Sequence, residues 1–457
     1  MRRPTLPAVL LVGMLAVLTA RAPSPAHAGP TTSDPFAAHQ WALDRIGAQQ
    51  AWAAGTGEGI VIAVVDTGVD LSHEDLSPKL VAGRDILDRD DTPQDCEGHG
   101  TLVAGVAAAA TDNGKGVAGT APGARIMPVR VLDCSGQVIA RDTVSEGIRW
   151  AVDHGAHVVN LSLGPELEPL LGGPAFSSAI EYAWSKGAIC VLAAPRADGA
   201  ESRFTDEPVI VVTATDRDDR LADYAGGVAA ARWGMAAPGG ADAGGDQDQR
   251  LREDIISTWW RSSGSTYGTS AGTSLAAPHV AGAAAVLRGL GLTPQETVDR
   301  LLATADDLGT PGPDRTFGHG RLNLGRATEG MGSAPPPPAP PPPPAPPAEP
   351  PATAAPPPTA PAGEGTTPHT TTAPASTTTA LPATSSTVDG AERRAGSDTG
   401  DDDEAVVIPE VPGPPDGGVS ERSRTAPATV AAVLAGAAAA GNGLLFRRRA
   451  RAGLAAR

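Results

Sequence analysis

Three short stretches of this sequence contain residue types that together can do nucleophilic chemistry. The segment VVDTGVD contains Asp66, GHGTLVAG contains His99, and GTSLAAPH contains Ser274. A carboxylate can orient an imidazole, and the imidazole can take the proton of a hydroxyl, which turns a weak alcohol into a nucleophile. Each residue alone has a simpler explanation, as a turn, a loop histidine or a helix N-cap. Their occurrence together, in the order Asp, His, Ser and beside glycines, predicts a serine peptidase.

The residues around each candidate predict an element that presents it. A continuous β-branched run precedes Asp66 and predicts a strand buried on both faces of a parallel sheet. The carboxyl end of such a strand is where ligands bind in open α/β sheets. Small residues in 102–110 predict a helix just after His99. Ser274 is expected to open an Ala-rich helix, 275–287, whose N–H groups and positive dipole end would lie beside the serine oxygen.

The sequence resembles the subtilisin-like serine proteases, or subtilases, in these three segments and in several others. The resemblance implies an α/β, subtilisin-like fold, with a mostly parallel central sheet and helices on both faces. It also implies that Asp66 orients the imidazole, that His99 is the general base and then the general acid, and that Ser274 is the nucleophile. The other matching stretches are 113–119, 121–122, 158–164, 236–239 and 318–323.

One position departs from the subtilase pattern. Subtilases have an asparagine after a later core strand, and its amide completes the oxyanion hole with the backbone N–H of the nucleophile, here Ser274. This sequence has Pro195 and Arg196 at that place. In subtilisin, loss of that donor lowers turnover about a hundred- to a thousandfold. Three alternatives remain open: Arg196 donates instead of the amide, the protease is slow, or the chain is a scaffold that keeps the fold.

The resemblance implies a peptide or protein substrate whose backbone pairs with an edge formed by Ser162, Leu163 and Gly164. Structural calcium is common in subtilases. No group of carboxylates in this sequence has a ligand spacing that assigns a site, so no metal or other cofactor is assigned. The formal net charge is -17, and no basic patch suits a nucleic acid.

The sequence has three cysteines, which suits an oxidising compartment with one pair and one thiol left over. Cys96 immediately precedes the histidine segment, and Cys134 follows the next predicted strand, 125–132. A disulfide between these two cysteines would hold the loops around His99. Cys190 is in the middle of an apolar strand and is expected to be a buried, unreactive thiol.

The N-terminal region has the pattern of a secretory signal. Two arginines near the start, the apolar run 8–20 and an A-x-A site ending at Ala28 predict a signal peptide over 1–28. A retained anchor is the alternative, and it is disfavoured because the apolar run is short. A short N-terminal extension, 29–39, would then lead into a peptidase domain over 40–328, which leaves no room for a separate folding propeptide.

The region after the peptidase domain predicts a spacer and an anchor. Proline, threonine and serine dominate 329–425, a composition that cannot bury a core and that predicts a disordered spacer. Residues 426–446 are uncharged and are followed by a basic tail, 447–457. This pattern predicts one transmembrane helix with the protease outside the cell and the arginines in the cytoplasm. The alternative is a loose amphiphilic helix or a processed tail.

The order of these segments resembles that of the mycosins, membrane-anchored subtilases of the type VII secretion systems. That resemblance implies a secretion complex as a partner, in which the chain would cleave secreted substrates, stabilise the complex, or both. A degradative protease at the cell surface is the alternative, and it differs only in its partners.

Overall fold

The structure is a computed structural model that describes residues 32–138, 142–163, 173–195, 204–228, 231–332 and 406–407. The predicted signal peptide, Gly164, Arg196, most of the spacer and the predicted span 426–446 lie outside these residues. The chain divides into two compact units, Met1–Glu410 and Val411–Arg457, and only the first contains described residues. Within the described part of the chain, no helix is both long enough and apolar enough to span a bilayer.

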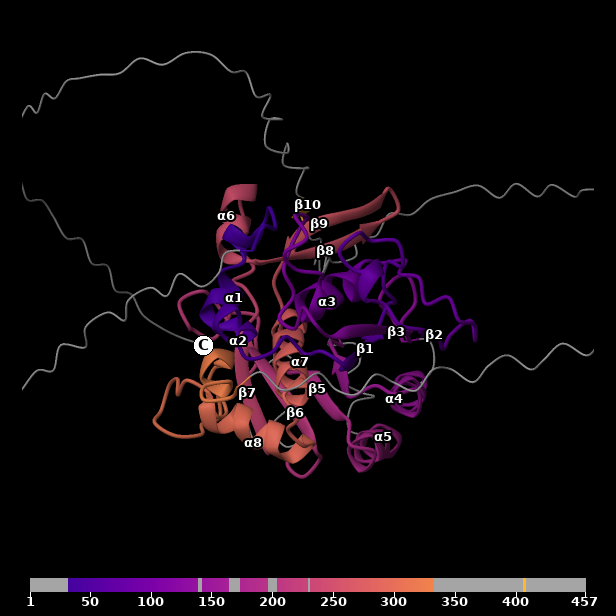
Figure 1. Cartoon of the computed structure of the whole chain (residues 1–457). Coiled ribbons are helices and arrows are strands. Elements are labelled where there is room, and N and C mark those ends of the chain that lie inside the picture. The colour runs from indigo at the N-terminus through magenta and orange to yellow at the C-terminus, as the bar shows by residue number, and fades with distance from the viewer. Residues whose placement is uncertain are drawn as a thin grey trace, which may run out of the picture. The chain divides into compact units, whose positions relative to one another are not determined.

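The strands of the main sheet are β1 (Val61–Asp66), β2 (Arg84–Asp85), β3 (Arg125–Arg130), β4 (Val158–Leu161), β5 (Ile189–Ala193), β6 (Val209–Thr215) and β7 (Trp233–Pro238). They lie in the order β2-β3-β1-β4-β5-β6-β7, and every pairing is parallel, which confirms the predicted parallel sheet (Figure 1). The strand order reverses between β1 and β4. In open α/β sheets, the crevice at such a reversal is where ligands bind.

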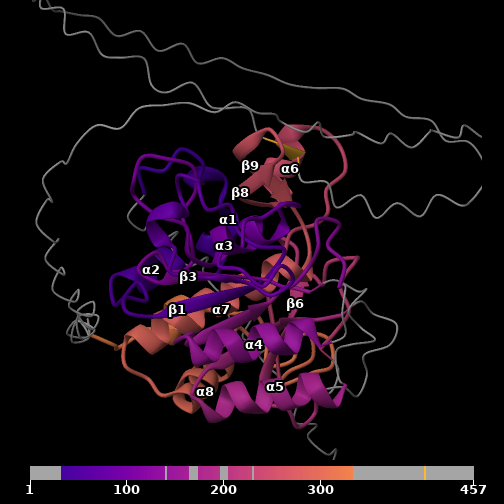
Figure 2. The same cartoon turned by 90° about the vertical axis from the view of Figure 1, so that its right-hand side faces the viewer.

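Helices cover both faces of this sheet because the strands are apolar on both faces. Ile62 and Val64 of β1 belong to one core cluster, and Ala63 and Val65 belong to the other. The first cluster contains α3 (His99–Ala108) and α7 (Thr273–Gly289), and the second contains α4 (Thr143–Asp153) and α5 (Pro174–Ser185). Figure 2 shows α4 and α5 in front of the strands and α7 behind them.

The packed domain begins before residue 40, the predicted boundary. Phe36 is buried, and its N–H donates to the carbonyl of Gly116 at 2.9 Å. The carboxylate of Asp34 accepts hydrogen bonds from the backbone N–H groups of Asp112 and Asn113. The N-terminal residues therefore pack on the loop after α3.

The other helices are η1 (Ala37–His39), α1 (Trp41–Arg45), α2 (Ala48–Trp52), η2 (Ser77–Lys79), α6 (Gln247–Glu253), α8 (Pro294–Thr304) and α9 (Leu324–Ala327).

A second, antiparallel sheet lies over α3 (Figure 1). It contains a hairpin of β8 (Ile255–Arg261) and β9 (Gly264–Ser270), and β10 (Val406–Val407) pairs with β9. The hydroxyls of Ser257 and Thr258 donate to carbonyls of α3, at Leu102 and Thr101. The hairpin packs on α3, which begins at His99. Its second strand, β9, ends three residues before Thr273, where α7 begins. The hairpin therefore links α3 to the helix that contains Ser274.

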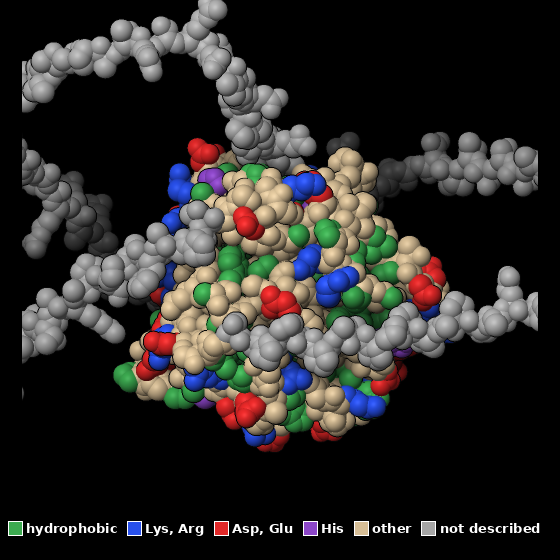
Figure 3. Space-filling view, viewed as in Figure 1, with side chains coloured by type: hydrophobic (Ala, Val, Ile, Leu, Met, Phe, Trp, Pro, Cys, Tyr) green, Lys and Arg blue, Asp and Glu red, His purple; other side chains and the backbone are tan. Residues whose placement is uncertain are grey.

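Acidic and basic side chains are interspersed over the face of the molecule in Figure 3.

Candidate active site

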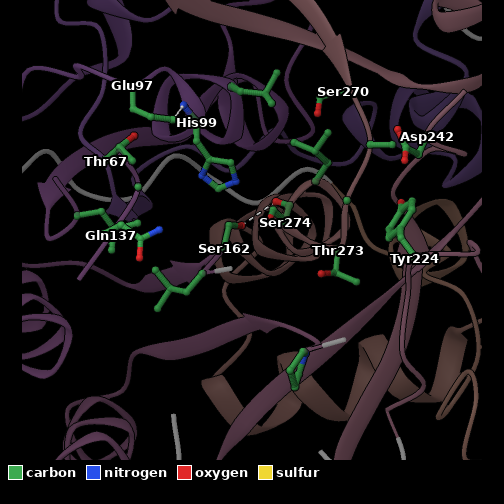
Figure 4. A pocket seen from close by; sticks show the side chains of 18 of the residues that line it. Thr67, Glu97, His99, Gln137, Ser162, Tyr224, Asp242, Ser270, Thr273 and Ser274 are labelled. Atoms are coloured by element: carbon green, nitrogen blue, oxygen red, sulfur yellow. Dashed lines mark hydrogen bonds between the residues drawn. The ribbon is translucent and has the colours of Figure 1, made fainter. Parts of the chain in front are cut away.

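The structure brings Asp66, His99 and Ser274 to the same end of the main sheet. Asp66 is fully buried at the carboxyl end of β1, and its Oδ1 lies 2.8 Å from Nδ1 of His99. The backbone N–H of Thr67 donates to the same oxygen and fixes the carboxylate. A proton on Nδ1 bonded to this carboxylate leaves Nε2 as an acceptor. Figure 4 shows the ring of His99 turned toward Ser274.

Two glycines allow α3 to begin against the end of β1. Gly68 has φ +106°, in the region that favours glycine, and a Cβ on Gly100 would overlap the carbonyl oxygen of Gly68. The helix starts at His99 itself, with Gly98 as its N-cap, whereas the sequence predicted a helix only from residue 102. The imidazole is therefore carried on the first residue of a helix and not on a preceding loop.

Asp95 organises the turn before His99, a role that the sequence analysis did not identify. It is fully buried, and both of its carboxylate oxygens accept hydrogen bonds from the turn and from the first turn of α3. An aspartate that bonds backbone N–H groups two and three residues later is typical of a turn. An aspartate just before the histidine segment was therefore the sequence signal that could have identified this role. Its partners include Thr67 Oγ1 and the N–H groups of Glu97, Gly98 and Thr101, at 2.9 to 3.0 Å.

Ser162 contacts the nucleophile's residue directly. Four residues after Ser274, α7 contains Pro278, which has no N–H to donate to the carbonyl of Ser274. The hydroxyl of Ser162 donates to that carbonyl at 2.7 Å and replaces the missing helix bond. The side-chain amide of Asn160, in β4, donates in turn to the hydroxyl of Ser162 at 2.9 Å. The resemblance implied only a substrate contact at Ser162, and the structure adds this support of Ser274.

Cys96 and Cys134 form a disulfide that joins the turn before His99 to the loop after β3. The next residue after each cysteine, Glu97 and Ser135, lines the cleft described below. Cys190 is a free, buried cysteine in β5, and burial raises the pKa of its thiol to about 12. The disulfide therefore holds two walls of the site, and the third cysteine takes no part in it.

A cleft of about 320 Å³ lies at His99 and Ser274, whereas Asp66 is buried behind the imidazole and does not line it (Figure 4). His99 and Ser274 line it, and so do Ser162 and Leu163 of the expected substrate edge and Pro195 of the expected oxyanion region. Gly164 and Arg196, the other residues of those two regions, lie outside the described residues. The sequence analysis did not identify several lining residues, among them Thr67, Glu97, Gln137, Tyr224 and Asp242.

The described residues contain no group of three or more His, Cys, Asp or Glu side chains placed to hold a metal ion.

The profile of the subtilase family, Peptidase S8, matches residues 57–320 of this chain. The chain belongs to the subtilase family. Thermitase of Thermoactinomyces vulgaris is 38% identical over 304 residues, which cover 65% of this chain and 99% of thermitase. Subtilisin BL of Lederbergia lenta is 34% identical, over 63% of this chain and 98% of that protein.

Solved structures of subtilases share the fold. A protease of Pseudoalteromonas arctica superposes with a TM-score of 0.55 and 31% identity, over 65% of this chain and 98% of that one. Fervidolysin of Fervidobacterium pennivorans, described as a keratinolytic enzyme related to subtilisin, superposes with a TM-score of 0.54 and 30% identity. That superposition covers 65% of this chain and 46% of fervidolysin.

In this subtilase, a serine endopeptidase, the geometry fits the family's reaction. His99 would take the proton of the Ser274 hydroxyl as the serine oxygen bonds to the substrate carbonyl carbon. Buried Asp66 stabilises the imidazolium that forms, and His99 then gives the proton to the leaving amine. Water repeats the sequence on the acyl-enzyme and frees Ser274. The N–H of Ser274 is in the first turn of α7, where N–H groups have no partner within the helix and can bind an oxyanion.

Proposed function

We propose that this subtilase is a membrane-tethered endopeptidase whose protease domain faces the outside of the cell. The observation that carries its catalytic part is the hydrogen bond between His99 and buried Asp66, on the wall of the cleft that contains Ser274. The tether is supported by the uncharged stretch 426–446 and by the arginines directly after it. Export is supported by the signal-peptide pattern of 1–28.

A fluorophosphonate probe tests the catalytic part, because it reacts only with an activated serine. The full chain should be labelled and should cleave an unfolded protein substrate, and Ser274→Ala should do neither. The N-cap of α7 is Gly272, so the substitution leaves the start of the helix in place and the fold should persist. Proteolysis by the Ser274→Ala chain at the original rate would overturn the assignment.

A second candidate function is a slow protease or a peptide-binding scaffold, and the specific observation for it is Arg196 where subtilases have asparagine. Arg196→Asn combined with Pro195→Gly tests it. If the arginine donates poorly to the oxyanion, the double variant should raise kcat with little change in KM, since that interaction forms only in the transition state. A fall in kcat would show that Arg196 is itself the donor. Absent labelling of Ser274 together with retained peptide binding would identify a scaffold.

The mycosin-like order of segments supports a role beside a type VII secretion complex. Affinity purification of the full chain from detergent-solubilised membranes tests this partner. Components of such a complex should co-purify with the unaltered chain and with Ser274→Ala. Recovery of the chain without them would favour the degradative cell-surface protease.

A further inference from the structure

The Cys96–Cys134 disulfide joins the two chain segments that lead to the catalytic pair. Cys96 is three residues before His99. The other segment, 131–132, lies just before Cys134, and its backbone N–H groups donate to the carbonyl oxygen of Asp66. The disulfide therefore closes a covalent ring beside the Asp66–His99 pair.

The two ends of this disulfide differ in how firmly the rest of the fold holds them. The turn before His99 has other support, because buried Asp95 accepts hydrogen bonds from several of its backbone N–H groups. Among the described residues, the hydrogen bonds of the turn 133–137 run within that turn, except for a contact between Cys134 and Arg130. The disulfide is therefore the link that joins the turn 133–137 to the opposite wall of the cleft.

The turn 133–137 belongs to the cleft. Ser135, Gly136 and Gln137 line it, and Figure 4 shows Gln137 on the same side of the His99 ring as Glu97. If the disulfide opens, this turn gains conformational freedom that a bound substrate must remove again. That loss of freedom weakens binding, whereas the catalytic pair keeps its own hydrogen bond.

The surroundings of the disulfide favour exchange with a thiol. Cys134 is exposed and Cys96 is partly exposed, so a small molecule can reach the bond. Nη2 of Arg130 donates to Sγ of Cys134 at 3.9 Å, and Nη1 of the same guanidinium is bonded to the carboxylates of Asp85 and Asp88. These carboxylates fix the guanidinium and offset part of its charge, so its effect on the sulfur is local. An N–H donor at a sulfur stabilises the thiolate that leaves in an exchange reaction.

We propose that this disulfide is a modification site for a low-molecular-weight thiol, through which the redox state of the surroundings controls substrate binding in the cleft. The thiolate forms a bond to Sγ of Cys96, the S–S bond breaks, and Cys134 leaves with the electron pair as a thiolate beside Arg130. A second thiolate attacks the external sulfur bound to Cys96, which releases Cys96 and yields the external disulfide. Overall, two thiols give their electrons and protons to the two protein sulfurs. The inference rests on the proposed peptidase function of the same cleft.

Reduced glutathione tests the site on the full chain. After a short exposure quenched with acid, mass spectrometry should find the glutathione adduct on Cys96, and reoxidation with diamide should restore the original bond. With fluorescein-labelled casein as substrate, the treated chain should show a KM raised about five- to tenfold and a kcat changed by less than about twofold. A loss of folded molecules would lower kcat and leave KM unchanged, so the two parameters separate control of binding from destabilisation.

Two cysteine variants are the controls for this response. Cys96→Ser combined with Cys134→Ser should have the raised KM without treatment and should not respond to glutathione. Cys190→Ala removes the free, buried thiol and keeps the disulfide, so its KM should respond as that of the unaltered chain does.

Arg130→Lys tests the contact at the leaving sulfur. A lysine keeps a cation for the buried carboxylate of Asp85 but lacks the fork of N–H groups that reaches Sγ of Cys134 as well. Adduct formation should therefore be about three- to tenfold slower in this variant.

The inference would be overturned by a bond that glutathione does not open, by an open bond with an unchanged KM, or by a kcat that falls alone. An adduct on Cys134, or an equal exchange rate in Arg130→Lys, would also contradict it. Absent fluorophosphonate labelling of Ser274 would instead overturn the proposed enzyme. In that case the Kd of the labelled casein, measured by anisotropy on the Ser274→Ala chain, still tests the control of binding and should rise by the same factor.

Discussion

Ser162 has a structural role in addition to its place in the expected substrate edge, because Pro278 interrupts the hydrogen bonding of α7. A helix that contains proline leaves one carbonyl without its donor, and here that carbonyl belongs to Ser274 itself. The hydroxyl of Ser162, which is fully buried and bonded to Asn160, supplies the donor from the residue directly after β4. The backbone that carries the nucleophile is therefore fixed to the sheet.

Ser162→Ala should lower kcat about ten- to a hundredfold with little change in KM. The substitution leaves a buried carbonyl and the amide of Asn160 unpaired, which corresponds to about 1 to 3 kcal/mol of lost positioning. Ser185→Ala is the matched control, since its hydroxyl also donates to a backbone carbonyl at 2.7 Å but at an exposed helix end. Steady-state kinetics on both variants measure this effect. A kcat of Ser162→Ala equal to that of Ser185→Ala would show that the bond does not position Ser274.

His279 should make the stability of the domain depend on pH. Its ring is buried, its Nδ1 lies 2.8 Å from the carbonyl oxygen of Leu275, and burial lowers its pKa from 6.5 to about 4. As the pH falls from 6.5 to 4, the unfolded chain binds a proton that the folded chain does not. The free energy of unfolding should therefore fall by up to about 3 kcal/mol over this window.

Urea unfolding at several pH values measures this dependence. In His279→Gln the stability should change less between pH 6.5 and 4, because the titrating group is gone. An identical pH slope in the variant and the unaltered chain would contradict the assignment to His279.

At the scale of elements, the disulfide and the hairpin hold the parts of the site together. The Cys96–Cys134 bond joins the turn before α3 to the loop after β3, and the β8–β9 hairpin bonds α3 through Ser257 and Thr258. The helix that begins at His99 is thus fixed from two directions.

Replacing both Cys96 and Cys134 by serine should lower the free energy of unfolding by about 3 to 4 kcal/mol, since the bond closes a loop with a sequence separation of 38 residues. Guanidinium unfolding monitored by fluorescence measures the loss. Dithiothreitol should lower the midpoint of the unaltered chain and leave that of the variant unchanged. A variant as stable as the oxidised chain would show that the bond does not stabilise the fold.

Local sequence patterns predicted the elements that carry the triad, because these depend on short-range properties. A β-branched run predicted β1 up to Asp66, and an Ala-rich run predicted the helix at Ser274. The start of α3 could not be predicted in this way, since it depends on the contact of Gly100 with Gly68. The bond between Ser162 and Ser274 joins residues 112 apart, so no local periodicity contains it.

The roles of two carboxylates before His99 were missed for a related physical reason. Asp95 and Glu97 have the sequence pattern of a solvated turn, and only the closing of β1, α3 and the hairpin around them gives one a buried position and the other a place on the cleft wall.

At the scale of the whole molecule, the proposed tether makes a prediction about release. Deleting 426–457 should move the protease from the membrane fraction to the medium as a folded and active domain, because none of the residues of the described cores lies there. Cell fractionation with activity assays measures this. Full-length, unprocessed chain found entirely in the medium would contradict the tether.

The pairing of β10 with β9 has a consequence for shortened forms of this protein. Val406 and Val407 occupy the hydrogen-bonding edge of β9 opposite Thr269 and Gly268. An uncovered strand edge is a template for pairing with another molecule and so for aggregation. A chain cut at residue 332 loses that cover, whereas one cut at 425 keeps it. The shorter form should therefore associate and precipitate as its concentration rises, although both forms contain every residue of the catalytic site.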